Sequence, residues 1–187
     1  QFGGSGGRRR RPGVTRAEVA VTVTLEEAFS GTKRLVTVTS QGRSRRLEVT
    51  IPPGVDDGSV VRISPTKNQQ VLIKVALSPH PTIGRKGNDL YLEATVPLED
   101  VILGGETEVV TLTGKVRLTI PPESQNGQRT RLAGQGMPKR SSPESRGDLY
   151  VRLRPTMPKD LTDEERDLVR RLKELRESRK GDVLTLR

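Results

Sequence analysis

Few side chains in this chain could carry out acid–base or nucleophilic chemistry. His80 is the sole histidine among 187 residues, and cysteine and tryptophan are absent. His80 lies in the segment SPHPTIGR between two prolines, where it could act as a general base, but no nucleophile motif such as GxSxG accompanies it. Without cysteine the chain has no thiolate nucleophile, no disulfide and no zinc finger. We therefore expect no catalytic residue and no enzymatic activity.

Two pairs of neighbouring carboxylates, Asp56-Asp57 and Glu26-Glu27, are the residues most suited to holding a metal ion. The first pair belongs to Val-Asp-Asp-Gly, a typical turn sequence, since Asp tolerates turn conformations and Gly supplies positive φ. The glycine motifs GGSGG and GQG neither follow a strand nor open a helix, so they are not phosphate loops. The sequence thus predicts no metal site and no cofactor.

Basic residues outnumber acidic ones by 33 to 23, which gives a formal net charge of +10. They concentrate in two places, Arg8–Arg11 and the set Lys33, Arg34, Arg43, Arg45 and Arg46. One interpretation is salt-sensitive, sequence-independent contact with DNA or RNA phosphates. The other is a solvated tail with charged edge strands that discourage aggregation, and the acidic residues spread through the chain favour it. Base stacking has little support, because only four residues are aromatic.

The elements that position these residues are predicted to be mostly strands. From residue 14 to about residue 153, apolar residues alternate with polar ones, as at Leu47, Val49 and Ile51, and Gly and Pro punctuate these runs. Residues 1–13, rich in Gly and Arg, are expected to form a disordered linker. No run of about 18 apolar residues offers a membrane span. Because the chain begins at Gln1, not Met, we expect a fragment.

An internal repeat divides the strand region in two. Ile51-Pro52-Pro53 precedes Gly58, and Ile120-Pro121-Pro122 precedes Gly127 at the same spacing. Upstream, TLEEAFSG is echoed by PLEDVILGG, and the first copy carries four extra residues, which we place in a hairpin near residues 40–43. We therefore expect an all-β fold with two tandem β-sandwich-like subdomains, residues 14–84 and 85–160. Units this small are marginal alone, so we expect them to dock on each other.

Helical periodicity occurs only near the end of the chain, in residues 161–187. Thr162 and Glu165 have the spacing of a capping box, and the sequence predicts an amphipathic helix over Thr162–Ser178 with Gly181 just beyond it. Leu168, Leu172 and Leu175 form one apolar stripe. This stripe either packs on the chain's own second subdomain or pairs with another protomer.

Several segments in the correct order resemble the C-terminal region of DnaJ-type co-chaperones. They are VTLEEAFSGTKRLVTV, RRLEVTIPPGVDDGSVVRI, LSPHPTIGRKGNDLYLEATVPLEDVILGG, VRLTIPPESQNGQRTRLAGQGMP and RGDLYVRL. The resemblance covers about Val14 to Ser178. Because the chain lacks cysteine, it resembles the class without the zinc module, which includes the curved-DNA-binding co-chaperones. The resemblance implies that a J-domain precedes Gln1.

The resemblance also implies a function for the first subdomain. In this family a client peptide adds a strand beside the segment Lys33–Thr39 in a shallow groove. We assign the groove to Val19, Val21, Arg34, Val36, Val38 and Ile83. Ile83 stands where the family often has an aromatic residue. We expect charged substitutions at Val36 and Val38 to weaken binding and to leave the thermal melt largely intact; the alternative is that these valines are core.

The expected partners are unfolded or hydrophobic polypeptides and a DnaK-type ATPase in the cytoplasm. The resemblance favours a homodimer formed through Leu168, Leu172 and Leu175. The second hypothesis is a DNA-binding module that uses Arg8–Arg11, which makes nucleic acid a secondary partner.

Overall fold

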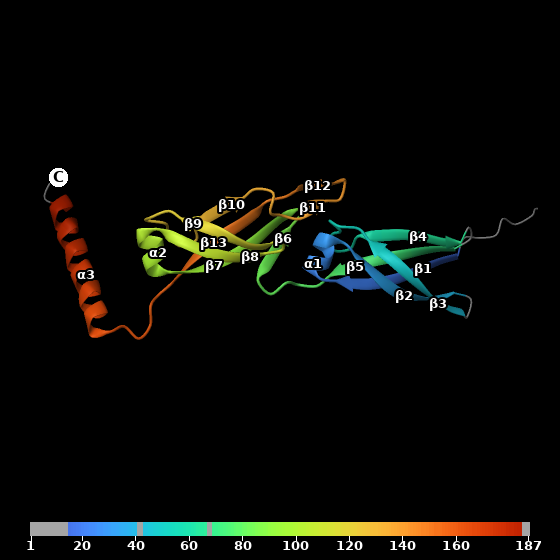
Figure 1. Ribbon diagram of the computed structural model, residues 1–187, viewed down its shortest axis with the longest axis horizontal. Helices are drawn as coiled ribbons and strands as arrows, with labels where there is room; N and C mark the ends of the chain where they lie inside the picture. Colours follow the sequence, from blue (N-terminus) through green and yellow to red (C-terminus); the bar gives the residue numbers. More distant parts are fainter. Residues whose placement is uncertain (1–14, 41–42, 67–68, 185–187) are drawn as a thin grey trace, which may run out of the picture.

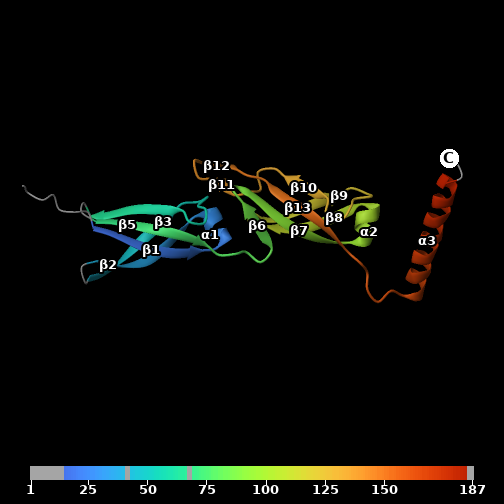
Figure 2. The ribbon, with the colours of Figure 1, turned by 180° about the vertical axis from the view of Figure 1, so that it is seen from behind.

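The computed structural model describes residues 15–40, 43–66 and 69–184. Two β-rich units lie end to end along an elongated molecule, and the helix α3 stands apart beyond the second unit (Figure 1). The view from behind shows the same order of parts (Figure 2). The predicted all-β fold with a C-terminal helix is confirmed, and each unit adds one short helix to its strands.

The first unit is a small sandwich of a three-stranded sheet and a hairpin. Its elements are β1 (Thr15–Val23), α1 (Leu25–Ser30), β2 (Thr32–Ser40), β3 (Arg43–Ile51), β4 (Val60–Thr66) and β5 (Gln69–Leu77). The sheet has the order β1-β5-β4, with β1 parallel to β5, and β2 pairs with β3. Alternation places Val36, Val38 and Val49 of the hairpin against Val71 and Ile73 of β5, which makes the core of this unit.

The second unit repeats this plan with one more strand in its sheet. Its elements are β6 (Ile83–Lys86), β7 (Asp89–Pro97), α2 (Leu98–Leu103), β8 (Gly105–Thr111), β9 (Gly114–Ile120), β10 (Arg129–Leu132), β11 (Pro138–Lys139), β12 (Ser142–Arg146) and β13 (Leu149–Thr156). The sheet order is β10-β13-β7-β6, and β8 pairs with β9. The boundary expected after residue 84 lies inside β6, which pairs with β7.

The internal repeat has a structural basis in each unit. Gly31 ends α1 at a φ of 77°, and a Cβ there would lie 3.1 Å from the Ile51 carbonyl oxygen; Gly104 ends α2 in the same way, against Pro122. The two repeated glycines are also equivalent. The Gly58 N–H donates to Val75 O at 2.8 Å, and the Gly127 N–H donates to Leu153 O at 2.9 Å.

The extra residues of the first copy lie in its hairpin, as the sequence predicted. Strands β2 and β3 have 9 residues each, whereas β8 and β9 have 7 each. The first unit therefore has the longer hairpin, which extends its open edge.

The helix α3 spans Asp163–Leu184 and is longer than predicted. The capping box is confirmed, because the Glu165 N–H donates to Thr162 Oγ1 at 3.2 Å and the Thr162 N–H donates to Glu165 Oε2 at 2.7 Å. Gly181 lies inside the helix and not beyond it. A single glycine in a helix costs only about 1 kcal/mol, so it does not force an end.

Candidate functional site

The first unit has two strand edges without a partner. Within the described residues, β2 pairs only with β3, and β1 pairs only with β5. These two strands lie in contact with each other but share no ladder. We call this pair of neighbouring, unpaired strand edges the β1/β2 seam. Val19 and Val21 of β1 lie half-buried beside it, and Val21 packs against both hydrophobic clusters of the molecule.

Val36 and Val38 do not form an open wall of this seam. Only 6% of Val36 and 2% of Val38 is exposed, and both face Val71 and Ile73 inside the sandwich. These valines are therefore core residues, the alternative left open above, and we expect charge at these positions to lower the thermal melt, because it would place an unpaired charge in the core. The opposite face of β2 carries Leu35, which is 76% exposed and which the sequence analysis did not single out.

Arg34 lies at the start of β2 and is already engaged with α1. Its guanidinium pairs with the Glu27 carboxylate, which in turn accepts the Thr24 N–H at 3.1 Å. The Thr24 N–H and then Arg34 hold the pKa of Glu27 below its usual range. Arg34 therefore ties β2 to the capping box of α1, at the edge of the seam.

Ile83 lies away from the seam, at the junction between the units. It is buried in β6 and borders a cavity of about 330 Å³ that Leu25 and Leu77 of the first unit also line. The six expected client-binding residues thus fall into two places, five around the first sandwich and Ile83 at the junction. Sequence order could not reveal this separation, because it depends on the pairing of β6 with β7.

His80 joins the two units and has no free ring nitrogen for catalysis. Its Nδ1 accepts the Ile83 N–H at 2.9 Å and the Thr82 N–H at 3.2 Å, and its Nε2 lies 3.0 Å from Glu26 Oε1. The described residues also hold no group of three or more side chains suited to a metal ion. The geometry of His80 is therefore that of a structural clamp.

Arg85 is a second clamp, and the sequence analysis did not single it out. Its side chain is 8% exposed, donates to the Val55 carbonyl at 2.7 Å and forms an ion pair with Asp56. Burial lowers the pKa of Arg85, and the neighbouring Asp56 opposes that shift. An arginine of the second unit thus satisfies groups of the first.

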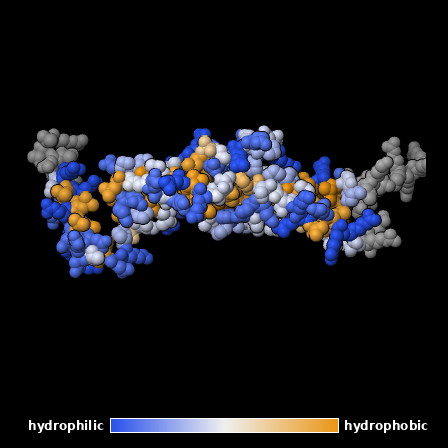
Figure 3. Space-filling view, viewed as in Figure 1, coloured by the Kyte–Doolittle hydropathy of each residue, from blue (hydrophilic) through white to orange (hydrophobic). Residues whose placement is uncertain are grey.

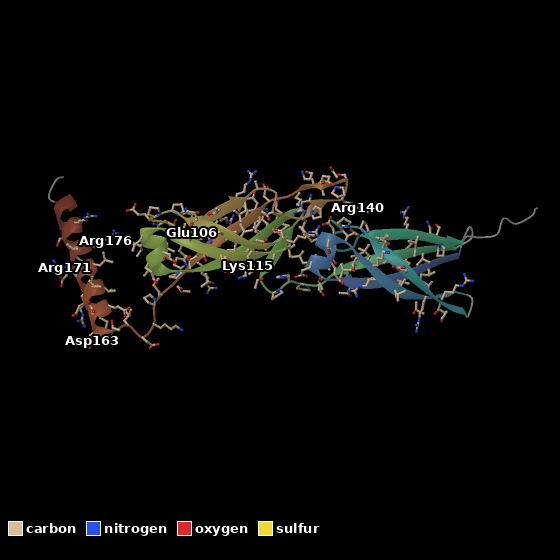
Figure 4. The ribbon with its side chains drawn as sticks, in the orientation of Figure 1. Glu106, Lys115, Arg140, Asp163, Arg171 and Arg176 are labelled. Atoms are coloured by element: carbon tan, nitrogen blue, oxygen red, sulfur yellow. The ribbon has the colours of Figure 1, made fainter. Side chains whose placement is uncertain are left out.

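The stripe on α3 is exposed to solvent. Leu168, Leu172 and Leu175 are 64%, 51% and 58% exposed, and Figure 3 shows apolar surface on this helix. The labelled charged residues Asp163, Arg171 and Arg176 belong to the same helix, which stands apart from the sheets (Figure 4). Of the two alternatives, packing on the chain's own second subdomain is therefore excluded for these leucines.

The basic residues give little support to a nucleic-acid site. Arg8–Arg11 and the Arg43 side chain lie outside the described residues. Lys33 pairs with Glu48 at 3.3 Å, and Arg34 pairs with Glu27. Part of the second basic concentration is therefore neutralised by Glu48 of the hairpin and Glu27 of α1.

A family model for the DnaJ C-terminal domain matches residues 17–158. The chain belongs to this family. It is 42% identical over 178 residues to chaperone protein DnaJ 2 of Thermus thermophilus, covering 92% of this chain and 60% of that protein. It is 37% identical over 179 residues to chaperone protein DnaJ of Deinococcus proteolyticus, covering 93% of this chain and 56% of that protein.

A curved DNA-binding protein of Coxiella burnetii is 34% identical over 172 residues, covering 82% of this chain and 54% of that protein. The chain thus spans little more than half the length of these relatives. The DnaJ C-terminal domain is a non-enzymatic family, which agrees with the expectation that this chain is not an enzyme. Within the described residues, the helices are too short or too polar for one of them to cross a membrane.

Proposed function

We propose that this chain is the client-binding part of a DnaJ-type co-chaperone and that extended, apolar segments of unfolded proteins add a strand to the free edge of β2. The observation that carries this proposal is the β1/β2 seam, where two unpaired strand edges flank half-buried Val19 and Val21. Main-chain hydrogen bonds hold an extended peptide whatever its sequence, and apolar contacts select exposed hydrophobic residues. A folded protein hides both features.

The side chains of an added strand would alternate between two surroundings. One set would point toward Val19 and Val21 on the face of β2 that carries Val36 and Val38, and the other would point outward on the side of Leu35. Burial of about 200–300 Å² of apolar surface contributes roughly 5–8 kcal/mol before ordering costs. The resulting affinity is on the order of micromolar or weaker, which suits a protein that passes its client on.

The second unit is the poorer acceptor, which supports assigning the client to the first. By the internal repeat, β7 corresponds to β1, and the edge of β7 that β1 leaves open is already paired with β6. The chain's own β6 thus occupies the β1 side of the equivalent opening, while β8, the counterpart of β2, pairs only with β9 within the described residues.

A proline on the free edge of β2 tests the proposal without disturbing the core. The Thr39 and Ser44 hydroxyl oxygens lie 3.1 Å apart, which is typical of a non-hydrogen-bonded pair whose backbone groups point away from the partner strand. By alternation, Thr37 also directs its N–H toward the open edge. Proline is tolerated at such edge positions but cannot donate to an added strand.

We expect Thr37→Pro to weaken binding of a labelled apolar peptide about tenfold or more in fluorescence anisotropy, the loss of roughly one hydrogen bond plus steric exclusion. Thr37→Val, which keeps the N–H, is the matched control and should bind as the parent chain does. A Thr37→Pro chain that melts like its parent and binds the peptide equally well would show that the client does not pair with β2.

The remaining parts of the function concern partners. We propose that the intact protein delivers its client to a DnaK-type ATPase in the cytoplasm and that α3 joins two chains into a homodimer. Two linked seams would then raise the effective concentration of a weak site. Binding of DNA through Arg8–Arg11 is the rival, and steep salt dependence that disappears when these arginines are deleted would favour it.

A further inference from the structure

The exposed face of the second sheet carries a cleft that is separate from the β1/β2 seam of the first unit. The strand register places residues of four strands in two neighbouring rows across this face. One row is Arg131, Tyr150, Tyr91 and Gly84, and the other begins with Arg129, Arg152 and Glu93. A cavity of about 310 Å³ lies over these rows, and we call it the tyrosine cleft. Its volume suits one or two side chains.

The floor of the tyrosine cleft is aromatic. The rings of Tyr91 and Tyr150 stack with their centroids 5.4 Å apart and their planes 16° apart. Gly84, opposite Tyr91, has no side chain to cover the ring, and a Cβ there would lie 3.8 Å from the Tyr91 Cβ. The rings are therefore packed against each other, half-buried and open from above. The 5.4 Å between the centroids leaves no room for a flat base between the two rings.

The rim of the cleft has an excess of positive charge. Arg129 has no ion pair with any residue that the structure describes, and Arg152 shares the single Glu93 carboxylate with Arg154, each at 3.6 Å. Arg131 pairs with Asp148 at 2.8 Å. This face therefore carries four arginines but only two carboxylates that pair with them. Guanidinium groups of this kind bind carboxylates in a planar, often bidentate geometry.

We propose that the tyrosine cleft binds an acidic segment of another polypeptide. An apolar or aromatic side chain of that segment rests on the tyrosine pair, and carboxylates on either side of it pair with Arg129 and Arg152. The ligand class follows from the charge of the rim and the size of the cavity. The cleft differs in selectivity from the β1/β2 seam, because the seam requires apolar residues alone, whereas the cleft requires negative charge beside an apolar group.

The test uses the full chain and two labelled peptides, Asp-Glu-Phe-Asp-Glu and its neutral counterpart Asn-Gln-Phe-Asn-Gln, in fluorescence anisotropy at low salt. We expect the acidic peptide to bind at least tenfold more tightly than the neutral one. Arg152→Gln and Arg129→Gln should each weaken the acidic peptide about five- to twentyfold, the range for an exposed charge-assisted hydrogen bond. Tyr150→Ser should weaken it similarly through the loss of the ring contact.

Arg117→Gln on β9 is the matched control, because Arg117 is exposed, pairs with Glu106 and lies outside the cleft. Equal effects of Arg117→Gln and Arg152→Gln, or equal affinities of the two peptides, would overturn the proposal. Tighter binding of a single-stranded oligonucleotide that displaces the acidic peptide would also overturn it in favour of phosphate recognition. Thr37→Pro should leave acidic-peptide binding unchanged, so failure of the cleft and failure of the seam are distinguishable.

Discussion

Asp56 and Arg85 show how a single buried charge holds the two units together. The Arg85 side chain is largely withdrawn from water, and its partners Val55 and Asp56 both belong to the first unit. Removing one partner of such a pair leaves the other charge uncompensated, which costs more than the loss of an exposed pair.

We expect Asp56→Asn to lower the free energy of unfolding by about 1–3 kcal/mol, measured by urea denaturation. Glu48→Gln, which breaks the exposed pair with Lys33, is the control and should change it by less than about 1 kcal/mol. Equal losses of unfolding free energy in the two variants would mean that the Asp56 carboxylate does not stabilise the buried Arg85 charge.

Glu27 makes the stability of α1 depend on pH. The Thr24 N–H and Arg34 lower the pKa of Glu27, so this carboxylate contributes stability at pH values above its unfolded pKa. That contribution disappears as the pH falls through the lower, folded pKa. The pKa of Glu26 is lowered too, chiefly by its own backbone N–H and by Thr24.

We expect Glu27→Gln to lower the melting temperature by about 1–3 °C at pH 7, and by less at an acidic pH that approaches the lowered pKa of the parent carboxyl, where this carboxyl begins to take up its proton. Glu18→Gln on the exposed face of β1 controls for the loss of one negative charge. A Glu27→Gln effect that is the same at both pH values would contradict the ionic role.

At the scale of elements, close backbone approach fixes how the units meet. Gly54 follows the first Ile-Pro-Pro segment at a φ of 79°, and a Cβ there would lie 2.5 Å from the Pro138 carbonyl oxygen of β11. Gly58, only a turn away, has a φ of 76° and open space around it. Both glycines therefore need a positive φ, but only Gly54 lies against the backbone of another segment.

We expect Gly58→Ala to cost about 1 kcal/mol in unfolding free energy, the strain of a positive φ. Gly54→Ala should cost about 2–4 kcal/mol, because the clash across the junction adds to that strain. Urea denaturation of both variants measures the difference. Equal costs would show that the junction relaxes to admit the methyl group.

At the scale of the whole molecule, one hydrophobic core spans both units. Val23, Ile51 and Val55 of the first unit belong to the same cluster as Leu90 and Met137 of the second. The two repeats therefore support each other, while the smaller core of Val36, Val38 and Ile73 belongs to the first sandwich alone. The β1/β2 seam lies beside this smaller core, because Val19 and Val21 pack against it.

The exposed stripe on α3 belongs to this scale, because it has no partner among the residues that the structure describes. We expect the parent chain to sediment as a dimer and Leu172→Glu to sediment as a monomer, since a charge in an apolar interface is costly. The melt of the β units should not change. Arg170→Gln, an equal change in charge on the opposite side of the helix, is the control, and a monomeric parent chain would contradict the proposed homodimer.

The sequence by itself determined the strands, the repeat and the capping box of α3, because each depends on local periodicity or on residues three positions apart. Alternation placed Val36 and Val38 on one face of β2, and the Ile-Pro-Pro repeat located the equivalent turns. The four extra residues were likewise readable from the spacing of the two copies.

Tertiary structure alone decided which of two strand faces is buried, since alternation is symmetric and only the docking of the hairpin on β5 makes Val36 interior and Leu35 exterior. The tertiary structure also decided that Ile83 belongs to the second sheet and that Arg85 pairs with Asp56 across the junction between the units. The tyrosine cleft arises in the same way, because Tyr91 and Tyr150 meet only through the parallel pairing of β7 with β13. Because such contacts join residues far apart in the chain, no local sequence pattern predicts them.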